Sequence, residues 1–288
     1  MSGWTIGIIG GSGLYDVEGV EDGHWVEVTS PWGRPSDECF VGRVGQVKVV
    51  FLPRHGRGHR ISPSELNARA NIDVLKRLGV TDVLAISSVG SLAEERAPGT
   101  FTIVDQFIDR TKGRPSSFFG SGMVAHVSMA DPVCPRLSAF AAEASRAAGA
   151  VTHQGGTYLA MEGPQFSTRA ESHLYRSWGC QVIGMTGMPE AKLAREAELP
   201  YALVGMITDY DCWREGEEAV DVAQVIAQLS ANAVKARALV THFLRALPET
   251  RPPSPIDTCL DTALITAPKV RDPALLAKLD AVAGRVLG

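Results

Sequence analysis

Two aspartates at the end of an apolar stretch offer the first candidate chemistry. Asp209 and Asp211 follow residues 201–207, a run that predicts a buried strand with both acids at its carboxyl end. Open α/β sheets bind ligands at that end. Two carboxyls so close do not both ionise readily, so one can donate a proton to a purine ring nitrogen while the other accepts from an exocyclic amine. The pair suits adenine, although a solvated acidic turn or a helix N-cap shows the same pattern.

A basic cluster follows a second predicted strand, 47–52. Residues 54–60 hold three arginines and two histidines, and Arg54 and His55 are nearest the strand end. An arginine fork matches phosphate geometry and histidine adds a donor. The cluster therefore predicts an oxyanion site, with a solvated basic turn as the alternative.

Small hydroxyl residues mark three further strand ends. Ser12 lies in a glycine-rich turn after strand 5–9, Ser87 and Ser88 follow strand 80–86, and Thr186 separates strand 181–184 from helix 191–197. Glycine and hydroxyl groups at such ends can bind an anion, while tight turns and helix caps are the structural alternatives. The glycine spacing does not fit the G-x-G-x-x-G pattern of dinucleotide sites. Together with the basic cluster, these ends predict one shared phosphate site.

The remaining elements complete an α/β chain. We expect further strands at 24–28, 101–108 and 151–161, and helices from 63, at 135–148, after 166, at 220–247, and at 272–286 with Asp272 as cap. The chain is interpreted as one α/β domain over 1–250, followed by a Pro-rich linker and C-terminal helical appendage over 251–288. Three side chains beside the predicted site have open roles. His126 could be a ligand contact or a surface residue, and Phe166 and Met185 could face a ligand or fill the core.

Composition limits the classes of partner. The net charge of −4 argues against non-specific binding to nucleic acid or a membrane surface. No run is long enough to span a bilayer and the N-terminus has no basic leader, so we expect a cytoplasmic protein. The five cysteines lack metal-ligand spacing, which predicts reduced thiols and no metal.

Phosphate opposite a purine-binding acid pair predicts phosphorolysis of an N-glycosidic bond. The ribosyl centre would develop positive charge beside bound phosphate while an acid protonates the base at N7. Inorganic phosphate would be a co-substrate, and the chemistry requires no cofactor.

Seven motifs resemble one family in consistent order from about residue 7 to residue 247. They are GIIGGSG, PRHGRGHRISPSELNARANI, SSVGSL, VDQFIDRTKGRPSSF, MEGPQFSTRAES, MTGMPEAKLARE and TDYDCW. The chain is similar to the purine nucleoside phosphorylase/methylthioadenosine phosphorylase family. The resemblance implies a mixed, partly closed β-sheet flanked by helices, assembled as a trimer or hexamer. It also implies pentosyl transfer, the phosphorolysis of S-methyl-5′-thioadenosine to adenine and 5-methylthioribose 1-phosphate.

The resemblance also implies a role for each site residue. Asp209 and Asp211 would bind N7 and N6, Phe166 would lie beside the purine and Met185 under the ribose. Val222 and Val225 would line a pocket for the 5′-methylthio group, His126 would reach a neighbouring subunit's 5′ pocket, and Ser167 and Val222 would influence specificity. Phosphate contacts would come from Ser12, Arg54, His55, Ser87, Ser88 and Thr186.

Alternative activities remain open at this point. Residues 184–188 are similar to the methylthioinosine-cleaving branch, which favours a 6-oxopurine nucleoside or methylthioinosine phosphorylase. Family members that select 6-oxopurines usually carry Asn where Asp209 stands, so adenine is the first choice. Ser12, Ser87 and Ser88 stand where Thr, Thr and Ala often occur, which keeps most of the donor chemistry. A nucleosidase would not need the Arg54 and His55 cluster, and the presence of both the acids and the cationic cluster argues against a non-catalytic nucleotide-binding module.

Overall fold

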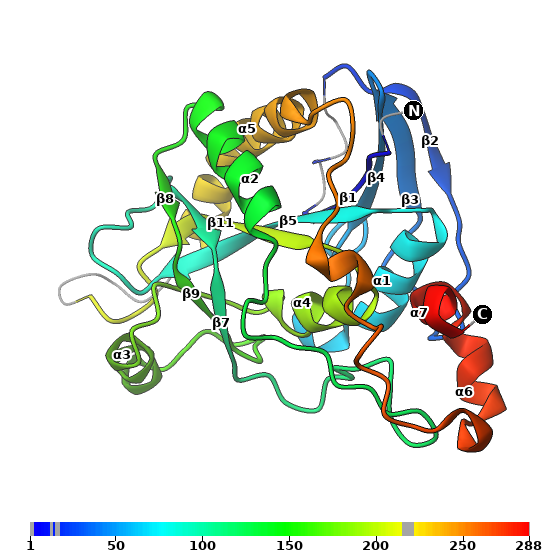
Figure 1. The fold of residues 1–288 in the computed structure, drawn as a ribbon. Helices are drawn as coiled ribbons and strands as arrows, with labels where there is room; N and C mark the ends of the chain where they lie inside the picture. Colours follow the sequence, from blue (N-terminus) through cyan, green and yellow to red (C-terminus); the bar gives the residue numbers. More distant parts are fainter. Residues whose placement is uncertain (1–2, 12–13, 15–17, 215–221, 288) are drawn as a thin grey trace.

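A computed structural model describes residues 3–11, 14, 18–214 and 222–287, with residues 222–224 by backbone only. In this part of the chain one mixed sheet of eleven strands is covered by helices on both faces (Figure 1). The strands are β1 Thr5–Gly10, β2 Glu21–Val26, β3 Cys39–Val44, β4 Val47–Pro53, β5 Asp82–Ser91, β6 Phe101–Val104, β7 Gln106–Asp109, β8 Thr152–Gln154, β9 Thr157–Ala160, β10 Val182–Gly184 and β11 Tyr201–Asp209. The helices are α1 Ala68–Arg77, α2 Pro135–Ala147, α3 Arg169–Ser177, α4 Gly187–Glu196, α5 Val222–Ala246, α6 Pro273–Lys278 and α7 Asp280–Leu287. The predicted mixed sheet flanked by helices is confirmed.

The long strand β5 is the centre of the sheet. Its first half pairs in parallel with β1 and along its length with β11, while its last residues pair antiparallel with β10. The main order is β2-β3-β4-β1-β5-β10-β9-β7, and a branch runs from β5 through β11 and β6 to β8. Because β1, β4 and β11 are all parallel to β5, their carboxyl ends lie at the same edge of the sheet. That edge carries most of the predicted site residues.

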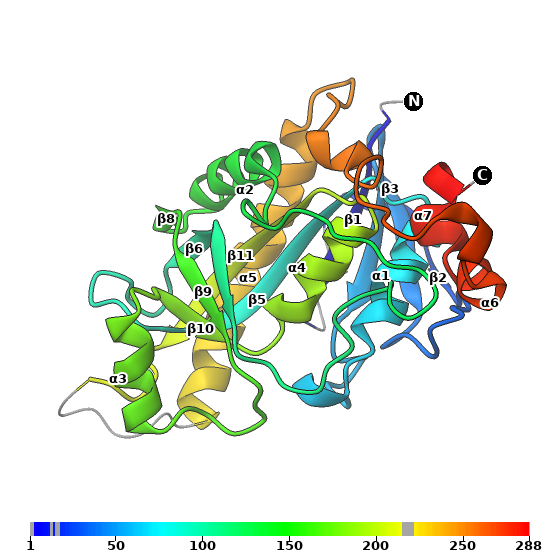
Figure 2. The ribbon, with the colours of Figure 1, turned by 60° about the horizontal axis from the view of Figure 1, so that its bottom comes forward.

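Helices cover the sheet in two pairs, α1 with α4 on one face and α2 with α5 on the other (Figures 1 and 2). The alternation of side chains along β11 supplies both cores. Leu203 and Ile207 join the core under α1 and α4, whereas Val204 and Met206 join the core under α2 and α5. Both faces of β11 are buried, and this explains why its sequence is a continuous apolar run without alternating polar residues.

Two predicted strands are each divided in the structure. The stretch 101–108 breaks at Asp105 into β6 and β7, which pair with β11 and β9 respectively. The stretch 151–161 breaks at Gly155 and Gly156, whose φ angles of 82° and 143° suit glycine. The prediction of one continuous strand in each stretch was wrong, because an apolar run does not show where the chain changes from one partner strand to another.

Other element boundaries also differ from the prediction. The helix expected from residue 63 begins as a short 3-10 turn, Pro63–Glu65, and α1 starts only after its cap Asn67, which accepts from the Ala70 amide at 3.1 Å. The C-terminal helix is two helices, α6 and α7, and Asp272 caps α6 as predicted. The strand Cys39–Val44 was not predicted at all.

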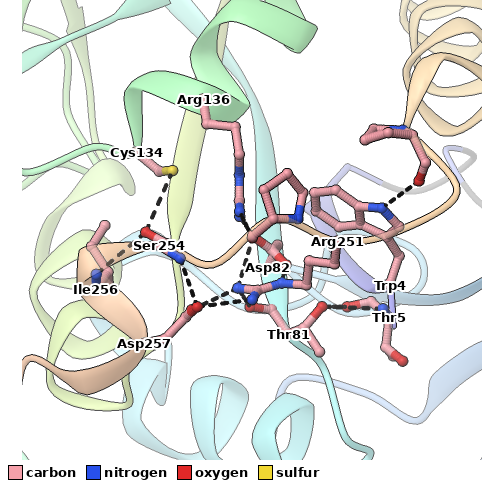
Figure 3. Close-up of polar contacts among 12 residues, drawn as sticks. Trp4, Thr5, Thr81, Asp82, Cys134, Arg136, Arg251, Ser254, Ile256 and Asp257 are labelled. Atoms are coloured by element: carbon pink, nitrogen blue, oxygen red, sulfur yellow. Dashed lines mark hydrogen bonds and ion pairs between the residues drawn. The ribbon is translucent and has the colours of Figure 1, made fainter. Parts of the chain in front are cut away.

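The segment after residue 250 packs on the body of the protein. Leu260, Leu279 and Val282 are buried in the same core as α1 and α4. Arg251 binds the fully buried Asp82 at the start of β5, and Arg136 of α2 pairs with the same carboxylate (Figure 3). Asp257 holds Arg251 from the other side, with Nη2 at 2.6 Å from Oδ1. These residues are at the end of β5 opposite to the predicted site.

No helix among the described residues is both long enough and apolar enough to cross a membrane.

Candidate active site

Asp209 is the last residue of β11, and its carboxyl group is held by two neighbours. Its Oδ2 accepts from the Thr208 hydroxyl at 2.7 Å and its Oδ1 accepts from the Asp211 amide at 2.8 Å. Burial raises the pKa of Asp209, and these two hydrogen bonds oppose that shift. Asp209 is therefore an oriented carboxyl group that gains a proton more easily than a surface aspartate.

Asp211 adopts a left-handed backbone conformation with φ of 54°, which is uncommon for a residue other than glycine. Burial raises its pKa to about 6, nearby Ser172 opposes the shift, and the charge of Asp209 adds to it. Its Oδ2 is buried with no hydrogen-bond partner among the described residues. A buried carboxylate oxygen without a partner is unusual and is available to a ligand donor.

The turn that carries both acids is fixed by its following residues. The Trp213 indole donates to the carbonyl of Ser91 at 2.8 Å, and Arg176 lies 3.4 Å above the centre of its ring. The Cys212 thiol donates to the carbonyl of Ser167 at 3.2 Å. The candidate specificity residue Ser167 is thus beside the acidic turn.

Arg54 lies at the end of β4 and is almost fully buried. Its Nε and Nη2 donate to the two oxygens of Glu190 at 2.9 and 3.0 Å, and Nη1 and Nη2 donate to the carbonyls of Ile86 and Ile9. Burial alone would lower its pKa, but the charge and hydrogen bonds of Glu190, together with the nearby Tyr201 and Tyr158, outweigh burial and raise it. Among the described residues, four of its five N–H donors have an acceptor, and one on Nη1 has none.

His55 is neutral in this structure at pH 7. Its Nδ1 lies 2.8 Å from the carbonyl of Ile61, which only a protonated nitrogen can satisfy, so Nε2 is the unprotonated nitrogen. Burial lowers the pKa of His55 to about 4. Its ring stacks on His59 with centroids 4.2 Å apart. His55 can accept a hydrogen bond at Nε2, and it donates there only after gaining a proton.

Two of the predicted hydroxyl groups, those of Ser87 and Thr186, lie together near Arg54. Ser87 Oγ and Thr186 Oγ1 are 3.3 Å apart, and Arg54 bonds the carbonyl of Ile86, the residue before Ser87. The expectation that the strand ends at residue 86 was wrong, because β5 continues to Ser91 and its polar residues pair with β10 and β11. Ser88 is partly exposed on the same strand.

The strand register separates the acidic turn from the hydroxyl groups along the sheet. Asp209 pairs with Gly90, three residues beyond Ser87 on β5. At about 3.3 Å per residue, the two backbone positions are roughly 10 Å apart along the strand. A small pocket is lined by Arg54, Pro63, Leu66, Ala68, Asn71, Arg114, Thr186, Met188, Pro189 and Glu190.

The other predicted residues have different surroundings. Met185, directly before Thr186, is partly buried, and Phe166 is 46% exposed. Val225 is partly exposed in the first turns of α5, whereas Ser12 and the side chain of Val222 lie outside the described residues. His126 is exposed, and its backbone amide donates to the carbonyl of Ala263 at 2.9 Å. It therefore lies beside the C-terminal segment of the chain.

Two important residues were not identified from the sequence. Glu190, which pairs with Arg54, is 136 positions further along the chain, and no local pattern marks it as a partner. Arg114 donates to the Glu162 carboxylate and to the carbonyls of Met185 and Met188. The only signal was that each of these residues stands inside a motif of the family.

Comparisons with known proteins agree with this arrangement. The phosphorylase superfamily profile matches residues 5–245. The chain belongs to this superfamily. Two similar proteins are both named S-methyl-5′-thioadenosine phosphorylase. The one from Cereibacter sphaeroides is 62% identical and covers 98% of both chains, and the one from Bradyrhizobium diazoefficiens is 58% identical over 100% of this chain and 99% of its own.

Solved structures show the same superfamily fold. A methylthioadenosine phosphorylase sourced from an antarctic soil metagenomic library has a TM-score of 0.92 and 44% identity, covering 98% of this chain and 99% of its own. A variant adenosine/methylthioadenosine phosphorylase from Schistosoma mansoni, in complex with methylthioadenosine, has a TM-score of 0.78 and 38% identity, covering 84% and 91%. The family and fold predicted from the motifs are confirmed.

Proposed function

We propose that this protein is a pentosyltransferase that cleaves S-methyl-5′-thioadenosine with phosphate, giving adenine and 5-methylthioribose 1-phosphate. The observation that carries the proposal is the pairing of two raised-pKa acids at the end of β11 with the Arg54, Ser87 and Thr186 group on neighbouring strands. Full-length similarity to proteins named for this activity supports it.

The reaction follows from the two ends of this site. A phosphate oxygen forms a bond to C1′ as the bond from C1′ to the purine nitrogen breaks, and the electron pair passes into the base. Asp209 gives a proton to N7, which relieves the charge on the leaving purine. Asp211 accepts from the exocyclic amine through its unpartnered Oδ2. Bound phosphate stabilises the positive ribosyl centre.

The remaining contacts are assigned by the family resemblance. Phosphate would be bound by Ser12, Arg54, His55, Ser87, Ser88 and Thr186. Met185 would lie under the ribose, Phe166 beside the purine, and Val222 and Val225 at the methylthio group, with Ser167 and Val222 setting specificity. His126 would complete a neighbouring subunit's pocket in a homotrimer or hexamer. We further propose a cytoplasmic enzyme of purine and methionine salvage in which phosphate is a co-substrate and no cofactor is needed.

The test is the release of free adenine from methylthioadenosine with and without phosphate. Adenine formed only with phosphate is the expected result. Equal release without phosphate would identify a nucleosidase, and no release of any base would favour a binding module. Hypoxanthine from methylthioinosine, without adenine from methylthioadenosine, would show that the 6-oxopurine alternative is correct.

A further inference from the structure

Arg114 is a buried arginine in the long connection between β7 and α2, which runs past α1 and α4 (Figure 2). Its side chain is 5% exposed, although the segment around it is largely at the surface. It lines the same pocket as Arg54 and Thr186. A buried cation next to a predicted phosphate site needs an explanation of its own.

The hydrogen bonds of Arg114 join three separate segments. Its Nε donates to both oxygens of Glu162 at 3.1 Å, and Nη2 donates to the carbonyl of Glu162 at 2.5 Å. Its Nη1 donates to the carbonyls of Met185 at 2.5 Å and Met188 at 3.2 Å. The last two acceptors are on either side of Thr186, so the guanidinium spans the turn that presents the Thr186 hydroxyl.

Glu162 is itself held on this cluster. Its Oε2 accepts from the Lys112 amide at 2.6 Å, and its pKa is lowered because these donors outweigh its partial burial. The next residue, Gly163, fits closely against the turn: a Cβ there would come within 2.4 Å of the Met185 sulfur. Arg114, Glu162 and Gly163 therefore determine where the Met185 side chain and the Thr186 hydroxyl lie.

The donors of Arg114 are almost all used by the protein. Five acceptor atoms take its hydrogen bonds, which leaves one N–H on Nη2. The adjacent Glu162 carboxylate also neutralises its charge. This is the arrangement of a group that orders the backbone, not of a ligand that binds an anion.

We infer that Arg114 is a positioning residue that holds the Met185–Met188 turn in the geometry required for both phosphate and nucleoside binding. The inference rests on the function proposed above, because that function places Thr186 at phosphate and Met185 under the ribose. The guanidinium presents five N–H donors on three nitrogens, whereas a lysine ammonium has three donors on one nitrogen and cannot serve all five acceptors.

The experiment compares Arg114→Met and Arg114→Lys with the wild type in steady-state phosphorolysis of methylthioadenosine, varying phosphate and nucleoside separately. A shift of about 1 Å in positioning groups costs roughly 100-fold. We expect kcat/KM to fall by about that factor for both substrates, equally in the two variants. Glu162→Gln keeps the Arg114 side chain and is expected to cause a smaller fall of kcat/KM for both substrates. It provides a second measurement if Arg114→Met does not fold.

Arg195→Met is the matched control. Arg195 is also a buried arginine on α4, and it donates to the carbonyls of Ser128 and Asp131 away from the pocket. Its loss is expected to lower the urea midpoint without changing kcat/KM. The inference would be overturned if kcat/KM of both Arg114 variants stayed within twofold of the wild-type value. It would also be overturned if Arg114→Lys restored turnover and changed only the phosphate KM, because that result would mean that Arg114 acts through its charge. A wild type without phosphate-dependent adenine release would instead refute the proposed function.

Discussion

Neutralising Glu190 is expected to weaken both folding and phosphate binding. In Glu190→Gln the buried Arg54 loses its counter-charge, and one of its two donors to Glu190 then faces an amide NH₂ group. Both side chains are at most 6% exposed, so water does not replace the lost partner. Removing one member of a buried pair costs about 3–5 kcal/mol.

The expected loss is large but need not unfold the protein. Domains are stable by roughly 5–15 kcal/mol, and a urea m-value of about 3 kcal/mol/M converts the loss to a midpoint shift of roughly 1–1.7 M. Because Arg54 also bonds the carbonyls of Ile9 and Ile86, its displacement would disturb β1 and β5 where the hydroxyls lie. We expect the phosphate KM to rise at least tenfold, which corresponds to about 1.4 kcal/mol.

Asp82→Asn is the control for this prediction. Asp82 is also a buried carboxylate, paired with Arg136 and Arg251 at the opposite end of β5 (Figure 3). It should lose a similar amount of stability, about 3–5 kcal/mol, with an unchanged phosphate KM. If Glu190→Gln shifts the urea midpoint but leaves the phosphate KM at the control value, Arg54 does not need Glu190 to bind phosphate. Retained phosphate turnover in Arg54→Met/Glu190→Leu would remove Arg54 from the site altogether.

Two pH experiments test other buried acids. Asp211 has a pKa of about 6, so it is ionised above that pH and protonated below it, and kcat/KM for methylthioadenosine should fall as the pH drops through 6. Asp211→Asn should have a lower rate and a profile without this limb; a limb that persists belongs to another group. Burial raises the pKa of Glu196 from 4.5 to about 7, although hydrogen bonds from the Phe118 amide and the Ser117 hydroxyl oppose the shift. The folded protein therefore favours the protonated carboxyl group. Its contribution to the free energy of unfolding is fully present below pH 4.5 and is lost as the pH rises through 7. Relative to the wild type, Glu196→Gln should gain about 3 kcal/mol in urea unfolding between pH 5 and pH 8, and a constant difference between the two proteins would refute the shift.

The sequence was informative where a pattern is local. The apolar run 201–207 followed by Asp209 and Asp211 specified a two-sided strand and the acids at its end. Arg54, directly after β4, was placed correctly for the same reason. Parallel strands bring their carboxyl ends together, so hydroxyl groups from distant segments could be expected near one another, as Ser87 and Thr186 are.

The sequence was uninformative where partners are distant. Ser87–Ser91 looked like a turn because the residues are small and polar, but β11 pairs with this stretch as far as Gly90, and β10 pairs with Gly90 and Ser91. The break at Asp105 follows from its acceptance of the Gly156 amide at 2.9 Å, a contact 51 residues away. The pairs Arg54 with Glu190 and Arg114 with Met185 are likewise defined only by the folded chain.

The Asp82 network has a consequence for how the protein is made. Arg251, which completes the neutralisation of Asp82, is 169 residues further along the chain, beyond the region that the superfamily profile covers. At about 5–20 residues per second, a ribosome needs roughly 10–30 s to synthesise that interval. During this time Asp82 has Arg136 as an arginine partner but not yet Arg251. Chains that stop near residue 245 would keep every predicted site residue and still lack one of the two arginines that pair with this buried carboxylate.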